Sequence, residues 1–150
     1  MPGPRPQPPD ERLSAKHEAG HAVMAILLHH KVTEMTVTPS GGSTVWRPQS
    51  RAFCCIMERG LIAAAGMVAQ SSYSEEPTFD ASDFADLRAM GFGGNAAATL
   101  YMLARAQLAR VPSAVDVLAE ALLSAPGRRL KGAELRRAVD AAIVEIAKAS

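Results

Sequence analysis

The residues best suited to do chemistry lie in one short stretch, residues 14–25, which reads SAKHEAGHAVMA. Two of the four histidines of the chain, His17 and His21, are four positions apart in it, and Glu18 directly follows the first. On a helix, such positions share a face with Cβ atoms about 5–6 Å apart, so both imidazoles can reach one metal ion. Glu18 lies about 100° further round the helix, where it can take a proton from water that the metal acidifies. The spacing therefore predicts two metal ligands and a general base.

A third protein ligand has to come from elsewhere in the chain. His29 and His30 begin eight residues beyond His21, about 12 Å further along a helix axis, which is too far to share one ion. The densest acidic stretch, EEPTFDASDFAD, is the remaining source of ligands. Its carboxylates belong to Glu75, Glu76, Asp80, Asp83 and Asp86.

The elements that must position these residues are mostly helical. Apolar periodicity predicts a helix over 10–30, which carries the His-Glu-x-x-His motif. A β-hairpin is predicted next, with strands at 31–39 and 44–48 around a turn at 40–43. Further helices are predicted over 51–70, from 83 to the glycine-rich segment at 91–95, and over 96–110, 114–124 and 132–148. The predicted fold class is mostly α (α+β), with the small hairpin placed after the histidine helix.

Composition narrows the class of protein. A length of 150 residues suits one domain, predicted over 10–150, preceded by a proline-rich disordered tail at 1–9. A net charge of +1 and the lack of a long apolar run argue against nucleic acid and membrane partners. The basic segment 127–137 is interpreted as a solvated helix face, because no aromatic residues interleave with its charges. Two cysteines, Cys54 and Cys55, are interpreted as core residues, and with no export signal they favour the cytoplasm.

Several motifs occur in an order that resembles the peptidase domain of the FtsH-type ATP-dependent zinc metalloproteases. They are HEAGHAVMA at 17–25, TVTP with two glycines at 36–42, IAAAGMVAQ at 62–70, ASDFADLRAM at 81–90 and LAEALLSAPGRRLKGAEL at 118–135. The likeness covers roughly residues 13–138. It implies a mostly helical domain with one zinc ion per chain, and it implies proteolysis.

The resemblance also implies roles for individual residues. His17 and His21 correspond to zinc ligands and Glu18 to the catalytic base, while Asp83 corresponds to the aspartate ligand at a helix start. The family's asparagine before that aspartate is missing here, so Asp80 and Asp86 remain alternative ligands. A second departure is Gln70, where the family has glutamate.

The expected function is zinc-dependent hydrolysis of peptide bonds in unfolded or flexible polypeptides. The 150 residues of this sequence contain neither the family's ATPase nor a Gly-x-x-x-x-Gly-Lys phosphate loop. A separate ATPase or adaptor is therefore a possible partner. The alternative is a catalytically silent zinc-containing binding or regulatory module on the same fold. Tyr73 and Tyr101 are candidates for stabilising the oxyanion.

Overall fold

The computed structural model describes residues 11–48, 56–71 and 81–150, except for the side chains of residues 81–84. The elements are α1 (Glu11–Leu27), β1 (His30–Thr38), β2 (Gly41–Pro48), α2 (Ile56–Gln70), α3 (Ala81–Ala89), α4 (Gly94–Leu108), α5 (Pro112–Ser124), a 3₁₀ turn (Pro126–Arg128), β3 (Arg129–Leu130) and α6 (Gly132–Lys148). The predicted mostly α fold with a hairpin after the first helix is confirmed. The tail predicted over 1–9 and both cysteines lie outside the described residues.

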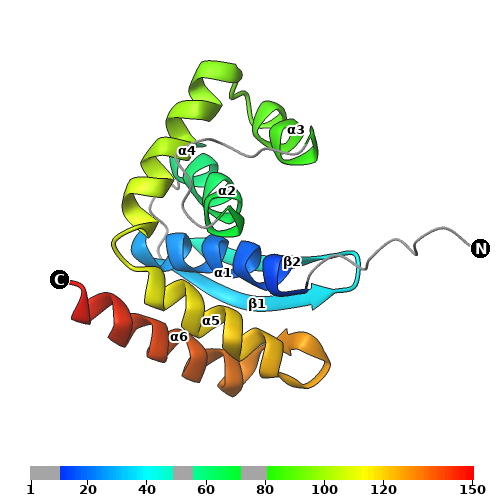
Figure 1. Cartoon of the computed structure of the whole chain (residues 1–150), viewed down its shortest axis with the longest axis vertical. Coiled ribbons are helices and arrows are strands. Elements are labelled where there is room, and N and C mark those ends of the chain that lie inside the picture. Colours follow the sequence, from blue (N-terminus) through cyan, green and yellow to red (C-terminus); the bar gives the residue numbers. More distant parts are fainter. Residues whose placement is uncertain (1–10, 49–55, 72–80) are drawn as a thin grey trace, which may run out of the picture.

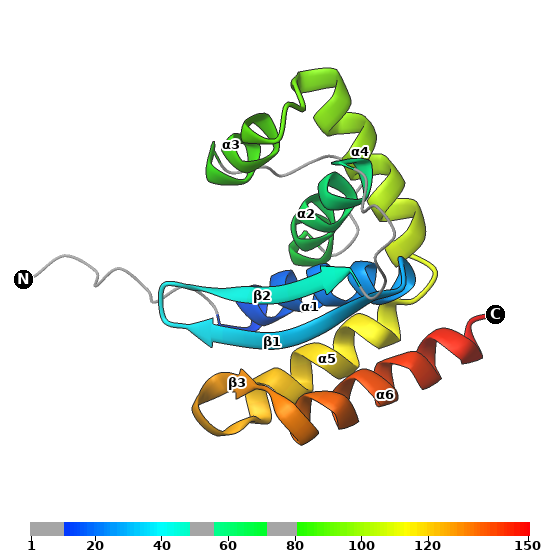
Figure 2. The same cartoon turned by 180° about the vertical axis from the view of Figure 1, so that it is seen from behind.

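Helix α1 occupies the centre of the fold (Figures 1 and 2). It packs against α2 on one side and α5 on the other, and the β1–β2 hairpin covers a further face. Leu13, near the start of α1, lies outside the core and is 40% exposed. Burial instead extends round the helix from Ala15 to Ala25, because three neighbours enclose it. The small alanine side chains of α1 allow these neighbours to approach closely.

The helix that carries the histidines ends three residues earlier than the sequence predicts. Leu27 is its last residue, and His29 adopts a left-handed backbone conformation with φ of 64°. A residue in this conformation commonly terminates a helix, and here it turns the chain directly into β1.

The sheet is antiparallel, with strand order β2-β1-β3. The hairpin turn is tighter than predicted, because Thr38 pairs with Gly41 and only Pro39 and Ser40 lie between the strands. Strand β3 was not predicted and pairs with only Met35 and Thr36 of β1. Strand β2 therefore forms one edge of the sheet and has β1 as its neighbour.

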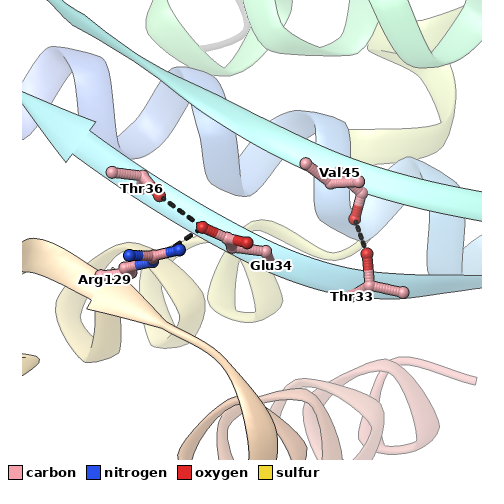
Figure 3. Close-up of polar contacts among 5 residues, drawn as sticks. All are labelled: Thr33, Glu34, Thr36, Val45 and Arg129. Carbon is pink, nitrogen blue, oxygen red and sulfur yellow. Dashed lines mark hydrogen bonds and ion pairs between the residues drawn. The ribbon is translucent and has the colours of Figure 1, made fainter.

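Polar contacts hold the short third strand against β1 (Figure 3). The guanidinium Nε of Arg129 lies 2.7 Å from Oε1 of Glu34, which also accepts a hydrogen bond from Thr36. The register of β1 and β2 shifts between Val32 and Glu34, and at this bulge the Thr33 hydroxyl donates to the carbonyl of Val45. Within the described residues, none of the helices is both long and apolar enough to cross a bilayer.

Candidate metal centre

The fold brings the three residues of the predicted motif to one point. The potential ligand atoms of His17, Glu18 and His21 all lie within 4.8 Å of one another. The two imidazole rings meet edge to face, with centroids 4.6 Å apart and an interplanar angle of 83°. Their Nε2 atoms both lie close to Gly66 of α2, because a Cβ added to this glycine would lie 2.5 Å from that of His21 and 2.8 Å from that of His17.

Each histidine is oriented by a hydrogen bond from its other ring nitrogen. Nδ1 of His21 lies 2.6 Å from the carbonyl oxygen of Ile62, which can only accept, so Nδ1 carries the proton. Nδ1 of His17 lies 2.9 Å from Oε1 of Gln70 and donates to it in the same way. Both Nε2 atoms consequently present a lone pair. Metal-binding histidines typically have such outer partners, which fix the tautomer and the ring direction.

Glu18 is held by the hairpin rather than by its own helix. Its side chain is 5% exposed, and its Oε1 accepts a hydrogen bond of 2.8 Å from the hydroxyl of Thr44 on β2. Gly42 provides the room for this carboxylate, because an added Cβ would lie 2.9 Å from Cγ and 3.1 Å from Oε2 of Glu18. The carboxylate is therefore fixed beside the two imidazoles.

Burial sets the proton affinities of the centre. It lowers the pKa of His21 to about 4, helped by the nearby His17 and opposed by the hydrogen bond to the carbonyl of Ile62. Burial raises the pKa of the Glu18 carboxyl, while the Thr44 hydroxyl and His17 act in the opposite direction. A neutral imidazole is the form that binds a metal ion. A carboxylate of raised pKa is also a better proton acceptor near neutral pH.

These observations fit a bound transition metal such as zinc. Two neutral imidazoles bring their Nε2 atoms close together, and the backbone of α2 passes beside them at a glycine. Imidazole nitrogen is a preferred zinc ligand, and catalytic zinc sites commonly combine two histidines with a carboxylate.

Replacing Gly66 with alanine tests this geometry. The added methyl group would overlap Nε2 and Cε1 of His21, so we expect both rings to be displaced and zinc affinity to fall at least about tenfold, as for the loss of outer-shell partners. Gly94→Ala is the matched control, because nothing lies within 4 Å of its added Cβ. Affinity would be measured by competition with a chromogenic chelator, and thermal unfolding of the metal-free proteins would establish that both variants fold. Wild-type zinc affinity in folded Gly66→Ala would contradict the proposed metal site between the two Nε2 atoms that pack against Gly66.

The low pKa of His21 predicts that acid destabilises the metal-free protein. The folded state keeps His21 neutral down to about pH 4, whereas an unfolded chain takes up this proton near pH 6.5. The contribution of His21 is thus fully present above pH 6.5, and about 3 kcal/mol is lost as the pH falls to 4. Urea unfolding of metal-stripped protein at pH 7 and pH 4.5 should show a larger loss for wild type than for His21→Gln. Equal losses in the two proteins would contradict this assignment.

A pocket of about 420 Å³ opens beside His21. Its apolar wall includes Val45 of β2, Ile62 of α2 and Met90, which follows α3. Trp46 forms another part of the wall, with the Arg59 guanidinium 5.7 Å from its ring centroid. Thr44 lines the pocket as well as contacting Glu18, so an apolar side chain bound here would lie next to the predicted base.

The remaining metal-ligand candidates from the sequence are an acidic group near α3 and two further histidines. Asp83 lies in the first turn of α3, a helix that packs on α2, but its side chain is outside the described residues. Asp86 is exposed on the same helix, and Asp80 lies outside the description. His29 and His30 are not part of the group formed by His17, Glu18 and His21, and both lie beyond the end of α1 rather than further along it. The ring of His30 stacks on Trp46, with centroids 5.0 Å apart.

The two tyrosine candidates gain no support as oxyanion donors. Tyr101 is fully buried in α4, and its hydroxyl is 2.7 Å from the hydroxyl of Ser71. Tyr73 lies outside the described residues. The fold therefore uses Tyr101 as a core residue with a satisfied hydroxyl.

Four groups of the site were not assigned a role from the sequence. They are the Thr44 hydroxyl, the space at Gly42, the carbonyl of Ile62 and the side chain of Gln70. Gln70 was recognised only as a departure from the FtsH-type pattern, although its Oε1 can accept from His17 as a glutamate would. Thr44 and Ile62 carry no local sequence signal, because their roles depend on residues 26 and 41 positions away.

The sequence matches no protein-family model, and a search of curated proteins finds no match. The resemblance to FtsH-type peptidases therefore stays a prediction that rests on the ordered motifs.

Proposed function

We propose that the protein is a zinc-dependent endopeptidase, with His17, His21 and Asp83 as ligands and Glu18 as the base. The observation that carries this function is the closeness of the two Nε2 atoms to each other beside Gly66, with Glu18 fixed next to them by Thr44. Zinc bound there would supply a Lewis acid that polarises a peptide carbonyl and acidifies water. Asp83 is proposed as the third ligand because it matches the aspartate of the FtsH-type motif.

The role of Glu18 follows from its surroundings. As a carboxylate it would accept a proton from the attacking water and pass it to the amine that leaves when the peptide bond breaks. The Thr44 hydroxyl holds Oε1, so the carboxylate keeps one orientation during this transfer. Burial of the side chain excludes bulk water from its contact with the imidazoles.

The outer edge of β2 would receive the substrate. This strand has β1 as its neighbour on one side, and its Thr44 contacts the base. An extended polypeptide can add to such an edge through main-chain hydrogen bonds, which select backbone shape more than sequence. The pocket beside His21 would accept an apolar side chain next to the cleaved bond. We therefore infer a broad specificity with some preference for apolar residues.

We expect the isolated protein to cleave loose chains such as casein without ATP, and to cleave a stably folded domain little or not at all. Edge-strand binding requires an extended backbone, and a folded domain hides its own. The measurement is a paired digest of casein and a folded domain, with and without ATP, using Glu18→Gln protein to exclude a contaminating protease. Efficient cleavage of the folded domain, or stimulation by ATP alone, would contradict this expectation. In the cell, a separate ATPase or adaptor would deliver folded substrates. We propose that the protein acts in the cytoplasm, where Cys54 and Cys55 would stay reduced.

A further inference from the structure

A second pocket, of about 560 Å³, is lined by residues of the hairpin and of α6 and includes none of the three residues of the candidate metal centre. It separates the first residues of β1 from helix α6, and we refer to it as the α6 groove. Its apolar surface comes from Val32 of β1 and from Leu135, Val139 and Ile143 of α6. Ile143 is 46% exposed, so part of this apolar surface is accessible to a ligand.

The α6 groove has an excess of positive charge. Lys31 and Arg47 line it from the two strands of the hairpin, where they stand opposite each other in the register, and Arg136 lines it from α6. All three side chains are exposed, and within the described residues none of them forms an ion pair. Like charges placed directly opposite in a hairpin are unfavourable, so an acidic ligand would relieve the repulsion between Lys31 and Arg47. Among the described residues that line the groove, Asp140 is the one that is acidic.

The backbone of β1 is open along this groove. Strand β3 pairs only with Met35 and Thr36, although β1 begins at His30. After Leu130 the chain turns away into α6, with Gly132 at φ of 58°. On this side of β1, residues 31–33 consequently have no strand partner in the described part of the chain. The ion pair between Arg129 and Glu34, shown in Figure 3, fixes β3 up to the point where the open edge begins.

We propose that the α6 groove binds an extended acidic segment of a partner protein, which adds to β1 as a strand in line with β3. Three features of the described part of the chain support this occupant together. They are a strand edge that has no strand partner there, three cations that form no ion pair there, and an apolar wall for the alternate side chains of the added strand. This binding requires neither the metal nor Glu18, so it does not depend on the proposed peptidase activity.

The test uses the full chain without metal and a short fluorescein-labelled peptide of alternating glutamate and valine, with binding measured by fluorescence anisotropy. Arg136→Glu should weaken binding about tenfold or more. Arg137→Glu is the matched control, because this neighbouring exposed arginine makes the same charge change but lines a different pocket. Asp140→Asn should tighten binding a few-fold, an effect that a misfolded variant would not produce.

Main-chain pairing is tested with two versions of the peptide, N-methylated at complementary sets of alternate amides. One version should lose binding and the other should keep it, because alternate amides of an added strand face β1. No binding of the parent peptide, equal weakening by Arg136→Glu and Arg137→Glu, or equal binding of both methylated versions would overturn the proposal. So would binding of a single-stranded oligonucleotide as tight as that of the peptide and equally dependent on Arg136.

Discussion

Replacing Glu18 with glutamine is expected to lower peptide hydrolysis by about 10²–10⁴-fold while leaving the zinc content unchanged. Glutamine retains the size of the side chain and an oxygen that can accept the hydrogen bond from Thr44. It cannot accept a proton from water at neutral pH. His17 and His21 keep their own hydrogen-bond partners, Gln70 and Ile62, which the substitution does not touch.

The measurement combines elemental analysis of zinc with initial rates on an unstructured fluorogenic peptide. Glu120→Gln provides a matched control, since it makes the same chemical change at an exposed position on α5. An unaltered turnover number in Glu18→Gln would rule out Glu18 as the base. Zinc binding without hydrolysis in the wild-type protein would favour the alternative of a catalytically silent zinc module.

Replacing Asp83 with alanine is expected to remove the zinc or to weaken its binding strongly. Loss of an outer-shell partner typically lowers metal affinity by about 10–100-fold, and loss of a direct ligand should cost more than that. The two histidines alone leave the ion with an incomplete set of protein ligands, since catalytic zinc sites normally have three. Hydrolysis should fall with the metal, and excess zinc should restore it only in part.

Asp80→Ala and Asp86→Ala are the controls for the third ligand. Asp86 is exposed on α3 one turn after Asp83, so its loss should leave the zinc in place. All variants would be compared by zinc stoichiometry after dialysis against a weak chelator. Loss of zinc in Asp80→Ala with full zinc in Asp83→Ala would show that the alignment with the FtsH-type motif is displaced.

Local patterns in the sequence predicted most of the secondary structure. The helix over 132–148 coincides with α6, and the first helix and the hairpin follow in the predicted order. These elements are specified by periodicity over neighbouring residues, which a sequence displays directly. The predicted turn at 40–43 was too long, because the pairing of Thr38 with Gly41 depends on the opposite strand. Strand β3 was missed for the same reason, since two residues have no periodicity and only their pairing with β1 defines them.

The sequence by itself determined the chemistry of the candidate centre, because His17, Glu18 and His21 lie within two turns of one helix and their spacing fixes their relative positions. Only the tertiary structure decided how these three side chains are oriented and which imidazole tautomer is present. The carbonyl of Ile62 selects the tautomer of His21, and Gln70 orients His17. The hairpin supplies the hydroxyl that holds Glu18, and α2 passes the two imidazoles at Gly66. These partners lie tens of residues from the motif along the chain, and contacts between such distant segments arise from the packing of α2 and the hairpin around α1 rather than from any local pattern.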